Sequence, residues 1–329
     1  MAYNIDSTKN VNGGGSTEII SPMLDVMFKR MFSIDSGAPM LCNFLETFID
    51  FNGNDVSSAN LMDKEIKRYP DDKGSILDLR VEAGGAEIDV EVQLMKLDGD
   101  RERFTLYLSK MYSEQLKEGM DYSEVHNCKS LIILDYTMPE YDRNNEFFHS
   151  FKFRDENGIV FSDALEMGII EIPRIRDIKI TQGLDDRVMW AKLFAAKSKG
   201  ELDMIGNSTS NTEIKKAVYV VKQLSENQVL RREAEARVKA INDEKARLRA
   251  ASKEGRAEGI AKGRAEGIAE GRAEGTEKMA QALRDMGYDE NMIAEAVKRS
   301  QENQAVSKSQ QAQQKPQAHK KTPPKRGSR

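Results

Sequence analysis

The sequence predicts an α/β domain, with a central mixed sheet flanked by helices, followed by a helical extension. Residues 75–95 alternate apolar and polar side chains in two runs joined by Gly84-Gly85, which is the pattern of a half-buried β-hairpin. Residues 22–48 repeat apolar side chains at helical spacing. Between residues 255 and 275 a glycine recurs at every fourth position, among Ala and Glu residues that favour helix.

The glycine pair predicts the pairing register of the hairpin. A two-residue turn places Ala83 opposite Ala86, and counting outward places Asp78 opposite Glu91. A slip by one residue would set polar against apolar side chains, so the pattern opposes it. The Cβ atoms of the two opposed acids would lie about 4.5–5.5 Å apart, with Gln93 on the same face. Two carboxylates this close repel each other, and a divalent metal with oxygen ligands is the usual solution.

The same polar face has a simpler interpretation. Charged strand faces are common on the solvent side of antiparallel sheets. The register also places Arg80 opposite Asp89, and these two side chains could form an ordinary ion pair. The alternation alone therefore leaves a metal site and a solvated strand face both open.

Further elements complete the predicted domain. A helix over residues 98–117 would bury Phe104, Leu108 and Met111 against the sheet. Trp190 falls in a later helix. Additional strands are expected over residues 60–68, 128–134 and 167–175, with a hairpin over 147–161.

The ordered motifs resemble those of the recombination-promoting nuclease family, also described as PD-(D/E)XK nuclease family transposases. The resemblance covers about residues 21–194. Asp78 followed by Glu91-Val92-Gln93 matches the Asp…Glu-X-Lys core, with Gln93 where lysine is usual. The other matching pieces are Pro22-x-x-Asp25-x-x-Phe28-Lys29-x-x-Phe32, residues 77–80, Arg103, Tyr107, residues 112–119, Tyr122, Glu171-Ile172-Pro173 and Trp190.

This resemblance implies a PD-(D/E)XK restriction-endonuclease-like core and a metal-dependent DNA endonuclease associated with recombination or mobile DNA. Asp78, Glu91 and the Val92 carbonyl would hold Mg²⁺ or Mn²⁺. Gln93 is expected to be catalytic through a hydrogen bond, because its amide can donate to water or phosphate but carries no charge. DNA is the expected partner.

Five further residues are candidates for supporting roles. The resemblance suggests that Asp25 and Lys29 approach the active site, although their spacing also suits a simple ion pair between successive helical turns. Arg103, Tyr107 and Lys110 form a stripe on the helix expected after the hairpin, and such a stripe could hold DNA phosphates. A solvated basic helix face is the alternative.

The extension has a composition of its own. Six helical glycines would cost on the order of 5 kcal/mol relative to alanine, which an isolated helix could not absorb. Either the segment is a flexible tether, or another helix packs along the stripe. We expect close packing and a homo-oligomer formed through the C-terminal helices. The predicted segments are 1–20 disordered, 21–200 nuclease-like domain, 210–253 long charged helix, 254–278 glycine-repeat helix, 279–299 helical hairpin and 300–329 disordered basic tail.

Composition excludes several classes of protein. The net charge of −4 over 329 residues is not that of a chain that binds nucleic acid by overall basicity. The longest aliphatic run, residues 131–134, is too short to span a membrane, and the N-terminus lacks an apolar signal region. Two cysteines and three histidines give neither a disulfide framework nor a zinc cluster. A cytoplasmic location without membrane attachment is therefore expected.

Two other functions remain open from the sequence. The chain could be a catalytically inactive nuclease fold that serves as a DNA-binding module. It could also be an oligomerisation or regulatory protein that acts through its C-terminal helices.

Overall fold

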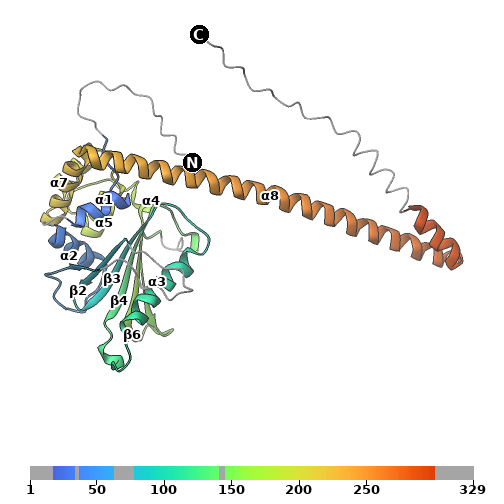
Figure 1. Ribbon diagram of the computed structural model, residues 1–329, viewed down its shortest axis with the longest axis horizontal. Coiled ribbons are helices and arrows are strands. Elements are labelled where there is room, and N and C mark those ends of the chain that lie inside the picture. Colours follow the sequence, from blue (N-terminus) through green and yellow to red (C-terminus); the bar gives the residue numbers. More distant parts are fainter. Residues whose placement is uncertain (1–17, 34–36, 63–77, 141–144, 301–329) are drawn as a thin grey trace, which may run out of the picture. The chain divides into compact units, whose positions relative to one another are not determined.

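The computed structural model describes residues 18–33, 37–62, 78–140 and 145–300 (Figure 1). The chain divides into two compact units, residues 1–245 and 246–329. The first unit contains the whole sheet and most of the helices. The terminal segments 1–17 and 301–329, where the sequence predicts disorder, lie outside the described residues. Ile20, inside the segment expected to be disordered, is buried, and its N–H donates to Ser225 Oγ over 3.1 Å.

The sheet has six strands in the order β1-β2-β3-β4-β6-β5. Strands β3, β4 and β6 run parallel to one another, and the other neighbouring pairs are antiparallel, so the sheet is mixed as predicted. The strands are β1 (Asn60–Leu61), β2 (Leu79–Ala83), β3 (Ala86–Gln93), β4 (Asn127–Leu134), β5 (Phe148–Arg154) and β6 (Val160–Glu171).

The β2–β3 hairpin has the predicted register, with Ala83 opposite Ala86 and Leu79 opposite Val90. Gly84 and Gly85 have φ angles of 56° and 72°, the left-handed conformation that a tight hairpin turn requires and that glycine adopts without strain. A Cβ on Gly84 would lie 2.5 Å from a ring carbon of Phe51, so the turn also packs too closely for a side chain.

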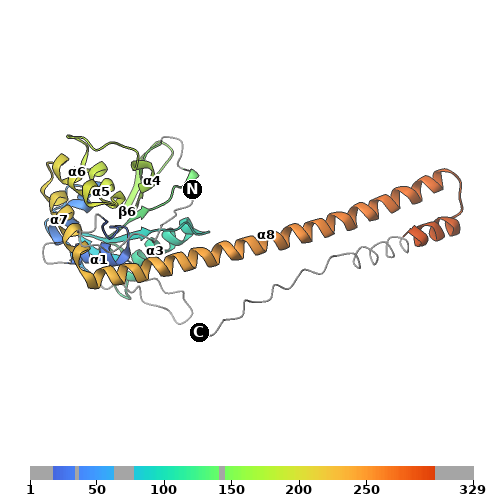
Figure 2. The ribbon, with the colours of Figure 1, turned by 90° about the horizontal axis from the view of Figure 1, so that it is seen from above.

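Helices cover both faces of the sheet. Figure 2 shows α1, α5, α6 and α7 clustered together. Their buried side chains form the main core with one face, and aromatic contacts among Phe28, Phe44, Trp190 and Phe194 lie at its centre. Helix α3 packs on the other face through Phe104, Leu108 and Met111. The helices are α1 (Asp25–Ser33), α2 (Gly37–Phe48), α3 (Asp100–Gln115), a 3₁₀ turn (Tyr122–Glu124), α4 (Ile172–Ile175), α5 (Asp186–Ala195), α6 (Lys199–Ser208), α7 (Thr212–Glu226) and α8 (Gln228–Asp285).

The two faces of β3 carry different chemistry. Ile88, Val90 and Val92 point into the main core, whereas Asp89 and Glu91 are buried on the α3 side. The interpretation of this polar face as a solvated surface was therefore wrong for β3, where Asp89 is 2% and Glu91 5% exposed.

The expected pairing of Arg80 with Asp89 was also wrong. The two residues are opposite in register, but the Arg80 guanidinium forms its ion pair with Glu87.

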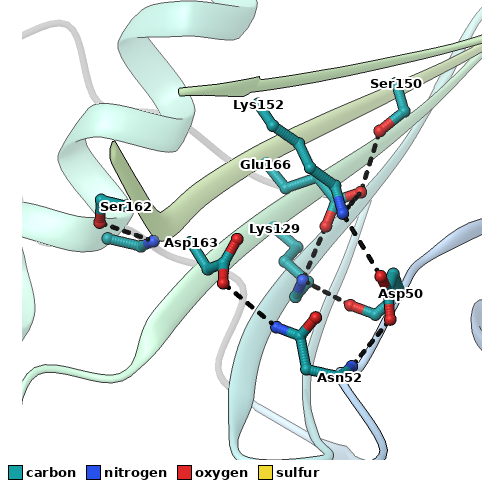
Figure 3. Close-up of polar contacts among 9 residues, drawn as sticks. Asp50, Asn52, Lys129, Ser150, Lys152, Ser162, Asp163 and Glu166 are labelled. Carbon is teal, nitrogen blue, oxygen red and sulfur yellow. Dashed lines mark hydrogen bonds and ion pairs between the residues drawn. The ribbon is translucent and has the colours of Figure 1, made fainter. Parts of the chain in front are cut away.

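A buried ion pair ties three strands to the segment after α2 (Figure 3). Lys129 of β4 is 3% exposed, and its Nζ lies 2.7 Å from Glu166 Oε2 of β6. The same ammonium donates to the carbonyl of Asp50 over 2.8 Å. Ser150 Oγ donates to the other Glu166 oxygen over 3.0 Å, and Lys152 Nζ lies 3.6 Å from it. Each charge is thus compensated inside the fold.

Two strands differ from their predicted bounds. Strand β6 begins at Val160, well before residue 167, and gives way to α4 after Glu171. Pro173 explains this end, because it has no N–H for the ladder and its fixed φ suits the first turn of a helix. Strand β1 covers only Asn60–Leu61, and residues 63–68 of the expected strand lie outside the described residues.

The long helix expected over residues 210–253 is interrupted at Asn227. The Asn227 side chain accepts hydrogen bonds from two N–H groups in the first turn of α8 and therefore acts as its N-cap. Asn211 caps α7, because its side chain accepts hydrogen bonds from the Glu213 and Ile214 N–H groups. Helix α8 then continues without a break through the six-glycine repeat, where an added Cβ would meet no atom within 4 Å. Self-association along this stripe stays a prediction.

Helix α8 ends at Asp285 and is followed by a turn that contains Gly287. The Tyr288 N–H donates to the Leu283 carbonyl over 3.2 Å, and the Gly287 N–H donates to the Arg284 carbonyl over 2.9 Å. This is a Schellman motif, with Gly287 at a φ of 84°. A further helix follows over residues 290–300. Of the helices that the structure describes, none has a stretch both long and apolar enough to cross a bilayer.

Candidate functional site

Two reciprocal hydrogen bonds hold Asp78 beside Glu91. The Asp78 backbone N–H donates to Glu91 Oε1 over 3.1 Å, and the Val92 N–H donates to Asp78 Oδ2 over 3.1 Å. Asp78 directly precedes β2, and Glu91 lies in β3 beyond the last paired residue of the hairpin. The hairpin register therefore brings the two carboxylates together, as the sequence predicts.

Lys29 of α1 reaches the Asp78 carboxylate. Its Nζ lies 2.9 Å from Asp78 Oδ1, and the side chain is partly exposed. Asp25, one turn earlier, pairs instead with Arg237 Nε of α8 at 3.0 Å. The two α1 residues thus do not form the simple ion pair that their spacing allowed, and only Lys29 joins the opposed carboxylates.

A chain of polar contacts continues from Glu91 to α3. Gln93 Nε2 donates to Glu91 Oε2 over 2.9 Å, and Gln93 Oε1 accepts from Arg103 Nη2 over 2.8 Å. The same nitrogen of Arg103 lies 3.0 Å from Asp100 Oδ1, and the Tyr136 hydroxyl donates to the other Asp100 oxygen. Both ends of the Gln93 amide therefore face complementary partners, which fixes its orientation.

The carboxylates on β3 are electrostatically strained. Burial, with a second contribution from Asp78, raises the pKa of Glu91 from 4.5 to about 7. Burial also raises the pKa of Asp89 well above its usual range, and the charge of Glu91 adds to this. Asp89 Oδ2 accepts from Ser130 Oγ over 3.2 Å, but among the described residues Oδ1 has no hydrogen-bond partner. The site favours either bound protons or an added cation.

The donor set fits a hard divalent cation. Within the described residues no group of three or more His, Cys, Asp or Glu side chains could hold a metal ion. Asp78 and Glu91 nevertheless offer two adjacent carboxylates, and Mg²⁺ is typically bound by one or two carboxylates with water and substrate phosphates completing its shell. The recorded contact of Val92 is a donor, its N–H, so the expected ligation through its carbonyl stays a prediction.

The structure separates the three candidates on α3. Arg103 reaches Gln93, whereas Tyr107 packs against the hydrophobic cluster formed by Leu108, Met111 and Cys128. Lys110 lies further along α3, and its contact with phosphates stays a prediction. The sequence patterns did not indicate a role for Asp100 or Tyr136. Asp100 pairs with Arg103, and the Tyr136 hydroxyl donates to Asp100. Both lie at the ends of elements, where no periodic pattern marks them.

The mixed sheet, with its opposed acids at the hairpin, is the arrangement of the PD-(D/E)XK nuclease fold. A family model for PD-(D/E)XK nuclease family transposases matches residues 22–251. This match covers more than half of the chain, and the protein belongs to that family. It includes Lys29 and the whole hairpin but leaves the glycine repeat outside. Comparison with curated proteins and with solved structures gave no match.

Proposed function

We propose that this protein is a metal-dependent DNA endonuclease that hydrolyses phosphodiester bonds during recombination or the movement of mobile DNA. The observation that carries the proposal is the pair of reciprocal hydrogen bonds that sets Asp78 against Glu91. The family match supports a nuclease, and the raised pKa of Glu91 supports a site that gains from a bound cation.

In this proposal Asp78 and Glu91 hold Mg²⁺ or Mn²⁺, with help from the Val92 carbonyl. When bound, such an ion lowers the pKa of a water molecule and stabilises negative charge on the scissile phosphate. Gln93 occupies the lysine position of the motif and presents an amide in place of a charge. Arg103 keeps that amide turned so that its NH₂ group faces the carboxylates.

Lys29 supplies the positive charge that Gln93 lacks. Its ammonium enters the site from a different element, α1, and lies against Asp78. A phosphate placed between the opposed carboxylates and α1 would meet this ammonium. Lys29 would then neutralise charge that develops on the phosphate during cleavage.

Cleavage of supercoiled plasmid tests the proposal. The wild type is expected to nick or linearise the plasmid in Mg²⁺ or Mn²⁺ but not in EDTA. Asp78→Ala and Glu91→Ala should each reduce the rate roughly a thousandfold, because several kcal/mol of transition-state stabilisation depend on the ion. Glu82→Ala is the matched control, since Glu82 is an exposed acid on the same hairpin. If the wild type binds DNA but never cleaves it, the chain is an inactive DNA-binding module.

Lys29→Met is expected to lower the cleavage rate by about 10- to 100-fold while metal binding persists. The methionine keeps the apolar stem but removes the charge beside Asp78. Metal titrations of the rate separate the two effects, and Lys29→Arg should recover part of the activity. The control is Asp25→Asn, which removes a charge one turn away that pairs with α8. Full activity in Lys29→Met would show that the ammonium only neutralises Asp78.

A further inference from the structure

A second charged cavity lies in the first compact unit, apart from the opposed carboxylates. Its volume is about 470 Å³, and it is lined by the segment that follows α4, the last turns of α5 and helix α6. Basic side chains outnumber acidic ones in its lining. The charged residues are Arg176, Lys179, Lys192 and Lys197 against Asp177 and Glu201.

Lys192 is the buried cation of this cavity. It is 6% exposed, and its Nζ donates to the backbone carbonyl of Arg176 over 2.9 Å. Among the residues that the structure describes, no carboxylate lies within ion-pair distance of this ammonium. Lys129 shows the contrast, because its buried ammonium contacts the Glu166 carboxylate at 2.7 Å. Lys192 thus keeps donor capacity directed at the cavity, since an ammonium has three N–H groups.

Of the two acidic residues that line the cavity, Glu201 accepts a hydrogen bond from another residue and Asp177 is exposed. Glu201 accepts the Lys197 N–H over 2.8 Å at the start of α6. Asp177 is exposed to solvent. Burial lowers the pKa of Lys192, and these two acids only partly oppose that effect. A buried charge without a counter-ion is costly, and an anion in the cavity would relieve that cost.

The cavity is linked to the candidate site by direct contacts. The Asp135 N–H donates to the Gln93 carbonyl over 2.9 Å, and the Asp135 carboxylate pairs with the Arg176 guanidinium. Arg176 in turn presents its carbonyl to Lys192. Three consecutive contacts of backbone and side chain therefore run from the motif residue Gln93 to the buried ammonium.

We propose that this cavity is a phosphate-binding subsite, anchored by Lys192, that holds an internal phosphate of the bound DNA strand. The inference rests on the proposed function, because DNA is taken as the substrate. Lys179 and Lys197 at the rim add attraction for the same strand. The chemistry recognised is a phosphate oxyanion, which a strand phosphodiester, a 5′-terminal phosphate or free phosphate could supply.

Binding of a fluorescently labelled duplex in EDTA tests the subsite without cleavage. Lys192→Met is expected to weaken binding about five- to tenfold and to reduce the slope of log affinity against log salt by about 1. Lys216→Gln serves as the charge control, since Lys216 is exposed on α7 and pairs with Glu213. Its affinity should match the wild type. Thermal unfolding of Lys192→Met should show equal or greater stability, because the variant removes an uncompensated buried charge.

Two further binding measurements identify which kind of phosphate the subsite holds. A duplex with and without a 5′-phosphate, and competition by inorganic phosphate, distinguish a terminal or free phosphate from an internal phosphodiester. Equal affinity of both duplexes, with competition only at high phosphate concentration, supports the internal phosphodiester. A strong preference for the 5′-phosphorylated duplex or for free phosphate that disappears in Lys192→Met would overturn the internal position.

Wild-type affinity and salt slope in Lys192→Met would overturn the subsite. If that variant fails to fold, the double variant Lys179→Gln/Lys197→Gln carries the test, because both side chains are exposed. Unchanged affinity in the double variant would then overturn the subsite. Failure of the proposed function gives a different result from failure of the subsite. The wild type itself would then show no DNA binding, or it would bind DNA through Lys192 and never cleave it.

Discussion

Glu91→Gln is expected to stabilise the metal-free protein by about 3 kcal/mol at pH 8 while it strongly lowers the rate of cleavage. The Glu91 pKa rises from 4.5 to about 7 on folding, and each unit corresponds to about 1.4 kcal/mol. Glutamine has nearly the same shape, carries no charge into the buried site and keeps an oxygen for the Asp78 N–H. Its NH₂ group replaces the oxygen that accepts from Gln93 Nε2, so that one hydrogen bond is lost and offsets part of the gain. Removal of a metal ligand should at the same time lower the cleavage rate roughly a thousandfold.

The pH dependence of this gain has a defined sign. A carboxyl with a raised folded pKa contributes stability that is present below about pH 4.5 and is lost as the pH rises through about 7. The advantage of Glu91→Gln should therefore be large at pH 8 and small at pH 5. Urea unfolding in EDTA at both pH values measures it. Glu82→Gln, on the exposed side of the hairpin turn, is the control and should show neither effect.

An equal difference between Glu91→Gln and wild type at both pH values would contradict the burial of a titrating charge at Glu91. Addition of Mg²⁺ provides a second check. It should raise the stability of the wild type by mass action but leave Glu91→Gln nearly unchanged.

Lys129→Met is expected to cost about 3–5 kcal/mol of stability. The substitution removes the closer of the two ammonium partners of the buried Glu166 carboxylate and leaves only the longer Lys152 contact, and removal of one partner of a buried ion pair destabilises by this amount. The double variant Lys129→Met/Glu166→Gln should recover much of the loss, because it removes both charges. Urea unfolding of the two variants and the wild type gives the comparison.

The matched control for this pair is Lys152→Met. Lys152 lies 3.6 Å from both Glu166 and Asp50, so it makes longer contacts than Lys129 and its loss should cost less. Cleavage by folded Lys129→Met should match the wild type, because Lys129 lies near the start of β4 and Gln93 aligns with Leu134 at its end. Equal costs for the two lysines would contradict the assignment of the buried charge to Lys129.

The hairpin and its opposed acids could be predicted because their determinants are local. Strand alternation sets which side chains share a face, and the glycine pair sets the turn, so Asp78 and Glu91 follow by counting. The mixed sheet with helices on both faces also follows from the order of strand and helix patterns.

The surroundings of the acids could not be predicted in the same way, because they depend on contacts between distant segments. The polar residues of β3 are buried, although an alternating strand is usually solvated on its polar face, and Gln93 contacts Arg103 of α3. Lys29 and Asp25 are separated by their distant partners, Asp78 and Arg237, which no local pattern contains. Three segments that are separate in the sequence line the cavity around Lys192. A single lysine within an apolar helix therefore does not predict the cavity.

The alternation of β3 has a consequence for how this family can vary. One set of its residues builds the core, and the other set builds the site, in strict alternation from Ala86 to Gln93. Deletion or insertion of a single residue inside the strand would exchange the two sets, placing acids in the core and aliphatic side chains in the site. A change of length inside this strand is therefore expected to disrupt both the core and the site. Within it, the chemistry can change only by substitution, one position at a time.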